Sequence, residues 1–537
     1  MKAASALAFA LALTATTTAS ARPCATASYE HATRALGLTH AHASRPFAKA
    51  KIVDSALYPI RVLYQGDELS VYAPPLIAAL EAAWTDIVVD GGYPAPLADD
   101  GAGGSDALDV YIMGIGPGIG ALTIADADAS PDDGRHAASA HIRIDPFTIG
   151  DALQSFVHHE FFHVVQFGID RSESLMFFES TAVYQEILFV DGEARFENIA
   201  DFQAHPNAPP FADGIDFNPS PFDLLLYEYG ASLFIAYLDE ELGQGDGSLI
   251  RDLWLASVQS DAVVENEPDW MDALAARGTP IEETTLDFAT WRALVATYAQ
   301  DDDGPSFASE LGTDTLVAAR ALDAVTLDGR PLVVAGNGAP HQSGCVVFRV
   351  TNQSGASKEL EIEGRFDDAS DRPLSFASAM GPPNDLQRAS VDGEGGHVST
   401  TLSLASGSTL LGALCDVGPA DADDDPSPTT LTYSVWDTAV EKYVPPVDAG
   451  EPEPDAEPEP SPEPEPMPFI CGCQQALPDG GPFGELRRVV APAFIFVSLG
   501  LFAFRVRRAM KRRKSYVGSS TGRSSTSAPT RDTASSP

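Results

Sequence analysis

Short apolar runs separated by polar and turn residues fill the chain between positions 55 and 145. Their length and their content of Val, Ile, Leu and Tyr favour strands. Four runs are expected to be strands: residues 60–64, 108–113, 121–124 and 140–144. Residues 74–90 differ, because apolar side chains recur there at intervals of three and four, which predicts a helix. We therefore expect a small sheet with one helix in this region.

Two apolar helical runs follow the predicted sheet. The first covers residues 156–168, contains no proline and ends on Gly168, where a helix C-cap belongs. A polar break at residues 170–174 separates it from a second run that begins at Phe177. Residues 222–300 are also mostly helical in pattern. Four aromatic residues in that stretch are expected to anchor a core: Trp254, Trp270, Phe288 and Trp291.

The pattern changes again between residues 315 and 440. Strand-like runs are split there by Gly, Asn, Asp and Pro, as in a β-sandwich. The runs are residues 332–335, 345–351, 360–364, 397–404, 408–415 and 430–436. At 537 residues the chain is too long for one compact core. We therefore predict an α+β protein with one domain over residues 22–305 and a β-sandwich domain over residues 306–443.

The first 21 residues have the features of a signal peptide. Lys2 precedes an apolar run, and Ala19-Ser20-Ala21 is an A-x-A cleavage site. The apolar run is too short to span a membrane as a helix. We therefore expect export, with residues 1–21 removed and a mature protein that begins at Arg22.

The C-terminal end predicts a stalk and an anchor. Residues 444–468 alternate Glu and Pro, which favours an extended, charged stalk without a core. Within residues 469–514, an apolar run at 489–504 is followed by a cluster of Lys and Arg, which predicts a membrane segment with a cytoplasmic end. Residues 515–537 form a polar tail that we expect to be disordered. The folded domains would then face outward at the cell surface.

Composition narrows the partners and the redox environment. Asp and Glu outnumber Lys and Arg by 77 to 33, a net charge of −44, which argues against nucleic acid as a partner. Five cysteines in an exported chain invite disulfides. Cys345 and Cys415 lie in one strand-rich region and could pair, whereas Cys471 and Cys473 are too close for good bridge geometry. Cys24 is left over.

Candidate chemistry is concentrated in the first helical run, in His159-Glu160-Phe161-Phe162-His163. Residues four apart lie one turn apart on the same helix face, so two imidazoles can converge on one metal ion. Glu160 is then placed to take a proton from a metal-bound water. The pattern predicts zinc at His159 and His163 with Glu160 as general base. The alternative is a helix whose histidines are surface residues or satisfied core residues.

A catalytic zinc has three protein ligands and one open position, so a third ligand is needed. Glu179, near the start of the second helical run, is the best candidate. Ser, Thr and Ala follow it, and these small residues let the two helices approach closely. Glu186, two turns further on, is the rival. The alternative for Glu179 is an exposed glutamate that complements the helix dipole.

These motifs resemble those of the gluzincin metallopeptidases. The H-E-x-x-H run followed by Phe178-Glu179-Ser180-Thr181-Ala182 is similar to the zinc helix and the E-G-x-A-like segment of that family. Residues 226–238 are similar to its Y-E-x-G helix start. The resemblance implies a zincin-like domain, built from a small mixed sheet and active-site helices. It also implies that Tyr227 stabilises the oxyanion, with Tyr229 as the alternative.

The chain departs from the aminopeptidases of that family in two respects. The gap from His163 to Glu179 is shorter. The segment that captures a free amino terminus is absent, because residues 118–124 lack its acidic pair. We therefore predict a zinc-dependent endopeptidase, with an aminopeptidase or a catalytically inactive adhesion module as alternatives. Residues 121–124 or 140–144 would form the edge strand that holds an extended peptide substrate.

Two further segments suggest an anchor and a second metal. Cys471-Gly472-Cys473, the apolar run and the cationic cluster together resemble the sorting tail of secreted myxobacterial metalloproteases. That resemblance implies processing at the cysteine, although the polar tail beyond the cations departs from it, and a plain single-pass anchor is the alternative.

Residues 126–134 alternate oxygen ligands and end in Gly, so they could hold calcium; a solvated acidic turn is the alternative.

Overall fold

The computed structural model describes residues 45–47, 49–115, 119–126, 135–150, 152–196, 198–212, 224–259, 268–300, 303–321, 336–367, 372–420 and 427–439. All of them belong to one unit, Met1–Pro446, and a second unit, Val447–Pro537, lies outside the described residues. The predicted signal peptide, stalk and apolar run at 489–504 also lie outside them. Among the described helices, none is long and apolar enough to cross a membrane.

The N-terminal sheet has five strands in the order β1-β2-β3-β5-β4. Its central pairs β2–β3 and β3–β5 are parallel, and the outer pairs β1–β2 and β4–β5 are antiparallel. Four strands lie where the sequence predicted them, and β1 was missed because its side chains are mostly exposed. The bounds are β1 Lys51–Asp54, β2 Ile60–Tyr64, β3 Leu108–Ile112, β4 Ala121–Ala125 and β5 Ala140–Ile144. Strand β4 therefore forms one edge of the sheet. It corresponds to residues 121–124, one of the two segments predicted as the edge strand.

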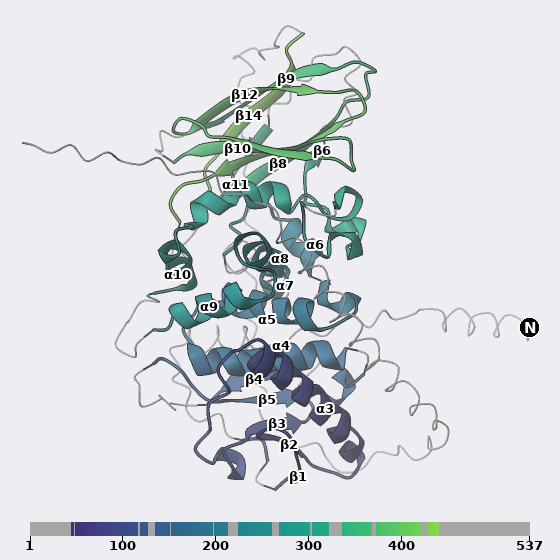
Figure 1. The fold of residues 1–537 in the computed structure, drawn as a ribbon, viewed down its shortest axis with the longest axis vertical. Coiled ribbons are helices and arrows are strands. Elements are labelled where there is room, and N and C mark those ends of the chain that lie inside the picture. Colours follow the sequence, from purple (N-terminus) through teal and green to yellow (C-terminus); the bar gives the residue numbers. More distant parts are fainter. Residues whose placement is uncertain are drawn as a thin grey trace, which may run out of the picture. The chain divides into compact units, whose positions relative to one another are not determined.

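Helix α3 (Ala73–Trp84) connects the parallel strands β2 and β3 and continues as a π-helical turn, η2 (Thr85–Asp90). Helices α4 (Leu153–Ile169) and α5 (Leu175–Phe189) follow the sheet. Figure 1 shows α4 between strand β4 and helix α5, and it contacts both elements. Almost every residue of α4 is buried, because the sheet, α3 and α5 surround it. An apolar helix of this kind is stable only inside a core.

Shorter helices complete this part: α6 Ile199–Gln203, α7 Leu224–Gly230, α8 Ser232–Tyr237, α9 Ser248–Ala256, α10 Trp270–Ala276 and α11 Ile281–Trp291. The four predicted aromatic anchors are all buried. Single turns lie at Glu68–Val71, Ala102–Gly104, Pro146–Thr148, Glu193–Phe196, Leu238–Leu242, Ala296–Tyr298, Ala308–Glu310 and Thr313–Thr315.

The C-terminal strands form two facing sheets, in the orders β11-β10-β13-β8-β6 and β12-β9-β14-β7. Buried side chains from both sheets, such as Phe348, Ile362 and Leu414, make one apolar core. This sandwich-like arrangement confirms the coarse prediction. The strands are β6 Arg320–Ala321, β7 Gly336–Gly338, β8 Cys345–Thr351, β9 Lys358–Phe366, β10 Leu374–Gly381, β11 Gln387–Val391, β12 His397–Leu404, β13 Thr409–Asp416 and β14 Leu431–Asp437. The predicted run 332–335 lies outside the described residues.

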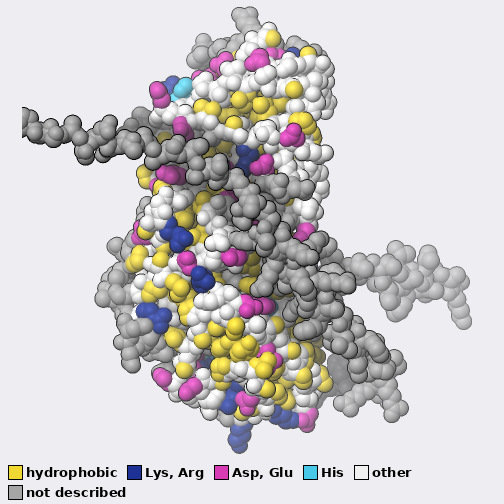
Figure 2. Space-filling view, viewed as in Figure 1, with side chains coloured by type: hydrophobic (Ala, Val, Ile, Leu, Met, Phe, Trp, Pro, Cys, Tyr) yellow, Lys and Arg dark blue, Asp and Glu magenta, His cyan; other side chains and the backbone are white. Residues whose placement is uncertain are grey.

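The predicted disulfide between Cys345 and Cys415 is present and joins the neighbouring strands β8 and β13. The disulfide lies where this sheet meets the helical part of the chain. Ala289, Ala293 and Leu294, in and after α11, pack against the sheet there. Small alanine side chains allow helix and strands to approach closely. On the face shown in Figure 2, acidic and basic side chains are interspersed with apolar ones.

Candidate functional site

Helices α4 and α5 bring three predicted ligands together. His159, His163 and Glu179 each offer one ligand atom, and these atoms lie within 4.8 Å of one another in a buried position. Glu179 Oε2 is 3.0 Å from His159 Nε2 and 3.3 Å from His163 Nε2, and the two Nε2 atoms are 3.0 Å apart. The spacing of the H-E-x-x-H motif and the packing of α5 on α4 produce this convergence.

The other nitrogen of each imidazole is held by a partner on the same helix pair. His159 Nδ1 lies 3.0 Å from Glu186 Oε1, and Ser155 hydrogen-bonds the second oxygen of that carboxylate. Because a carboxylate only accepts, His159 Nδ1 carries the proton. The Nε2 atom of His159 therefore faces the other two ligand atoms. Glu186, the rival for the third ligand, instead contacts the Nδ1 side of His159.

His163 is fixed in the same way by an amide. Its Nδ1 is 2.6 Å from Gln166 Oε1. The Gln166 amide nitrogen donates to the Phe178 carbonyl at 2.8 Å and to Thr181 Oγ1 at 2.9 Å, which sets the orientation of the amide. The Gln166 oxygen must then accept from His163 Nδ1. Both imidazoles thus turn their Nε2 atoms to the same point.

Electrostatics favour an ionised third ligand. Burial by itself raises the pKa of Glu179, but the nearby His163 charge and the hydrogen bonds from both imidazoles outweigh burial and hold that pKa below its usual range. Glu179 is therefore a carboxylate at any ordinary pH. Those hydrogen bonds place protons on the Nε2 atoms, 3.0 and 3.3 Å from Glu179 Oε2. A bound cation would displace these protons and take both Nε2 lone pairs and Oε2 as ligands.

The donor set fits zinc. Bonds of about 2.0–2.1 Å in a tetrahedron place ligand atoms about 3.3 Å apart. The observed separations of 3.0, 3.0 and 3.3 Å need only a small expansion to reach that geometry. Two imidazoles and one carboxylate are also a ligand set of catalytic zinc sites.

Glu160 lies beside the triad and is tied to the edge strand. Thr123, in the middle of β4, has its hydroxyl 2.6 Å from Glu160 Oε2 and 3.0 Å from the Glu160 backbone oxygen. Both residues are buried. The strand thus fixes the orientation of the carboxylate that the sequence assigned as general base.

The two candidate tyrosines lie in different surroundings. The Tyr227 hydroxyl donates to the Pro209 carbonyl at 2.6 Å, and burial raises the pKa of Tyr227. Its ring packs against Phe202. The Tyr229 ring, by contrast, lies 5.5 Å from the ring of His159. Tyr229, the alternative tyrosine, therefore has a ring contact with a residue of the triad.

The third histidine of the run faces away from the triad. His158 Nε2 lies 2.9 Å from Asp86 Oδ2 on the η2 turn, and its Nδ1 faces the Gln154 carbonyl.

Of the predicted calcium segment, only Asp126 is described. It pairs with Arg45 and His141, and residues 127–134 lie outside the described residues.

Sequence reasoning missed the supporting residues of the site. Thr123, Gln166 and Asp86 carry no motif, because their partners are close in space and not at a fixed spacing. Glu186 is the exception, because the sequence already pointed to it as the second candidate for the third ligand. Its position seven residues after Glu179 puts both carboxylates on the same side of α5, two turns apart.

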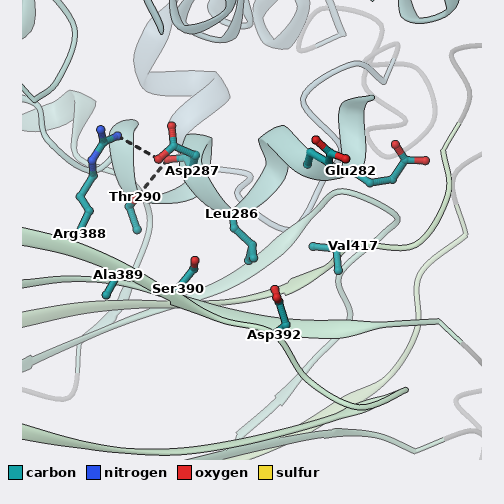
Figure 3. A pocket seen from close by; sticks show the side chains of 10 residues that line it. Glu282, Leu286, Asp287, Thr290, Arg388, Ala389, Ser390, Asp392 and Val417 are labelled. Carbon is teal, nitrogen blue, oxygen red and sulfur yellow. Dashed lines mark hydrogen bonds and ion pairs between the residues drawn. The ribbon is translucent and has the colours of Figure 1, made fainter. Parts of the chain in front are cut away.

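The structure also has a cleft of about 520 Å³ between helix α11 and strand β11, drawn in Figure 3. Glu282, Glu283 and Asp287 line the helix side, and Arg388 and Asp392 line the strand side. Arg388 Nη1 lies 3.4 Å from Asp287 Oδ1. No residue of the triad lines this cleft.

Comparisons with known proteins do not identify a family. No family model matches the chain, and no curated protein matches it. Among solved structures, the chain is similar to the pre-peptidase C-terminal domain of a collagenase from Bacillus anthracis, at 15% identity over 22% of this chain and 94% of that chain, with a TM-score of 0.15. It is also similar to the arabinose-bound α-L-arabinofuranosidase MgGH51, at 10% identity over 20% and 23% of the two chains, TM-score 0.13. A β-(1,4)-mannanase from Podospora anserina gives 8% identity over 22% and 29%, also at 0.13. Scores this low carry no argument about fold or activity.

Proposed function

We propose that this chain is a zinc-dependent endopeptidase of zincin-like fold, with His159, His163 and Glu179 as metal ligands. One observation carries the proposal: three ligand atoms converge within 4.8 Å in a buried site. The fixed Nδ1 partners of both imidazoles turn their Nε2 atoms toward Glu179. Zinc, when bound there, supplies Lewis-acid polarisation of the scissile carbonyl and of the attacking water.

Glu160 is the proposed general base. Its carboxylate accepts a proton from the attacking water as the C–O bond forms, and it returns that proton to the nitrogen as the peptide C–N bond breaks. Thr123 holds Oε2 of this carboxylate, so the base is oriented before substrate binds. Water and the peptide are thus converted to a carboxylic acid and an amine.

Replacing Glu160 by Gln tests this role. We expect Glu160→Gln to lower the rate of hydrolysis of N-acetylated peptides by about 10²–10⁴-fold while one zinc per chain is retained. Glu283→Gln, at an exposed position on α11, is the matched control and should cleave like the wild type. Mass spectrometry of the products measures both outcomes. Cleavage by Glu160→Gln at the wild-type rate would contradict the mechanism. Failure of the wild type to cut any blocked peptide would contradict the endopeptidase assignment.

Tyr229 is the proposed oxyanion donor, because its ring lies beside His159 while Tyr227 donates to Pro209. Removing one such donor costs about 10²–10³-fold in kcat. We expect Tyr229→Phe to show this loss with little change in thermal stability. Tyr227→Phe should instead lower stability by about 1 kcal/mol and leave kcat within a few-fold. The reverse pattern would return the role to Tyr227. Export and surface anchoring stay predictions, since their residues lie outside the described part.

A further inference from the structure

A second cluster of buried charges lies at the end of strand β4. Arg45, at the start of the described chain, contacts three aspartates from three separate segments. Its Nη2 is 2.6 Å from Asp99 Oδ2 and 2.8 Å from Asp126 Oδ2, and its Nη1 is 3.7 Å from Asp109 Oδ2. Asp109 lies on β3, and Asp126 directly follows β4. We call these four residues the Arg45 socket.

The socket is nearly closed to solvent. The side chains of Asp99 and Asp109 are 5% and 0% exposed, and those of Arg45 and Asp126 are 13% and 15% exposed. Three carboxylates thus share one guanidinium in a place where water screens poorly. Among the described residues, Asp99 Oδ1 and Asp109 Oδ1 have no hydrogen-bond partner. Removing the guanidinium would leave three like charges in contact with little compensation.

Neighbouring groups do not replace Arg45. The Tyr111 hydroxyl donates to Asp109 Oδ2 at 2.9 Å, which is a neutral contact. His141 Nδ1 lies 3.1 Å from Asp126 Oδ1, but burial lowers the pKa of His141, so this imidazole is uncharged near pH 7. Arg61, the other cation near Asp109, pairs with Asp54 at the surface. Arg45 is therefore the main internal counter-ion of the socket.

The socket connects to the proposed active site through one short strand. The Asp126 carboxylate contacts Arg45 and Ser139 through Oδ2 and His141 through Oδ1. Three residues before Asp126, Thr123 hydrogen-bonds the Glu160 carboxylate. In the part of the chain that the structure describes, β4 is an edge strand that pairs with β5 alone, and helix α4 packs on it. A displaced Asp126 would therefore move Thr123.

We propose that Arg45 is a positioning residue for the general base: it holds the end of β4 and, through Thr123, sets the orientation of the Glu160 carboxylate. The inference rests on the proposed function. Phe47 supports it, since its ring packs against Tyr111, 5.6 Å away between centroids. Residues 45–47 thus dock on the strand ends at two points. Hydrolysis is coupled in this way to the docking of the segment that precedes the sheet.

A double-mutant cycle on the zinc-loaded full-length chain tests this coupling. Arg45→Ala should lower kcat by about tenfold with KM nearly unchanged, because a small displacement of a catalytic group is costly while substrate contacts remain. Thr123→Val should cause a similar loss. The double variant should match Thr123→Val alone, since both changes act on the same contact. Lys51→Ala, which removes an exposed ion pair with Asp67 on the same stretch of chain, is the control and should leave kcat unchanged.

Chemical rescue supplies a readout that does not depend on activity. Methylguanidinium should raise the melting temperature of Arg45→Ala in a saturable way, because it refills the socket, and it should restore kcat at least severalfold. Wild type and Lys51→Ala should show no such rise. If Arg45→Ala does not fold, Arg45→Lys replaces it in the cycle. We expect Arg45→Lys to lower kcat by about two- to threefold. In the Thr123→Val background, Arg45→Lys should cause no further loss of kcat.

Three results would overturn the inference. The first is that Arg45→Ala hydrolyses peptides at the wild-type rate. The second is that the double variant loses kcat by the product of the two single losses. The third is that methylguanidinium does not raise the melting temperature of Arg45→Ala. Each of these with an active wild type contradicts the positioning role alone. A wild type that binds zinc but hydrolyses nothing overturns the proposed function and this inference together.

Discussion

The metal triad and the Arg45 socket are both buried clusters of ionisable side chains, and they balance their charges differently. In the socket, a guanidinium from the chain itself lies between the carboxylates. In the triad, two imidazole nitrogens and one carboxylate oxygen converge on a common point. Among the described residues, the triad is the one group of His, Cys, Asp or Glu whose ligand atoms come this close together. Convergence, and not burial or acidity, therefore distinguishes the proposed metal site from the socket.

The outer partners of the two clusters differ as well. Each imidazole of the triad is oriented by a hydrogen bond at Nδ1, to Glu186 or Gln166. Such contacts are typical of metal ligands, because they fix the tautomer that presents Nε2. In the socket, Asp99 and Asp109 instead keep oxygens without hydrogen bonds among the described residues. The triad has the arrangement expected of the proposed metal site, whereas the cation of the socket is part of the chain.

Metal removal should separate the two clusters most strongly. Zinc at about a thousandfold above its dissociation constant stabilises a protein by about 4 kcal/mol. We expect a chelator to lower the melting temperature of the wild type and of Arg45→Ala by the same amount, and added zinc to restore it. Glu179→Ala should show no chelator effect. Calorimetry measures all three, and a chelator effect that depends on Arg45 would mean that the clusters are not independent.

Changing an outer partner should have the next largest effect. Loss of such a partner typically costs about 10–100-fold in metal affinity. We expect Glu186→Ala to weaken zinc binding by about this factor in competition titrations. Asp86→Ala is the matched control, because it removes the carboxylate partner of His158, which lies outside the triad. Equal zinc affinity in Glu186→Ala and the wild type would show that Glu186 does not orient His159.

The smallest effect concerns the pH dependence of the socket. Burial raises the pKa of Asp99 to about 6: the Arg45 charge lowers it, but the charges of Asp109 and Asp126 raise it further. A carboxyl whose pKa is higher in the folded state loses protons more readily when unfolded, so its stabilising contribution falls as the pH rises from about 4 to about 6. We expect a loss on the order of 1–2 kcal/mol over this range.

Urea unfolding at pH 4, 5, 6 and 7 measures that loss. The decline attributable to Asp99 should be absent in Asp99→Asn. The control is Asp100→Asn, because Asp100 is exposed and has a positive φ that Asn tolerates. Parallel pH profiles for wild type and Asp99→Asn would show that the socket is fully neutralised by Arg45.

Local patterns predicted the parts of this molecule that depend on short spacing. The i, i+4 histidines, the following Glu179 and the strands β2, β8 and β12 all have signals within a few residues. Strands β10 and β11 were missed because Ala, Ser and polar residues replace the usual alternation of large apolar side chains. The choice between Tyr227 and Tyr229 depends on how a short helix is rotated, which the chain alone does not reveal.

The Arg45 socket had no sequence signal. Arg45 pairs with residues 54 and 81 positions away, and only the fold brings the loop residue Asp99 and the end of β4 to the same place. The same holds for Thr123, which lies 37 residues before its partner Glu160. Contacts of this kind follow from the register of the sheet and not from any motif.

The zinc content of the purified full-length chain tests the central claim most directly. Elemental analysis after dialysis should find one zinc per chain in the wild type, in Glu160→Gln and in Arg45→Ala. The same measurement should find almost none in the double variant His163→Ala/Glu179→Ala. A wild type that takes up no zinc, or a double variant that keeps a full equivalent, would contradict the assignment of His159, His163 and Glu179 as a metal site.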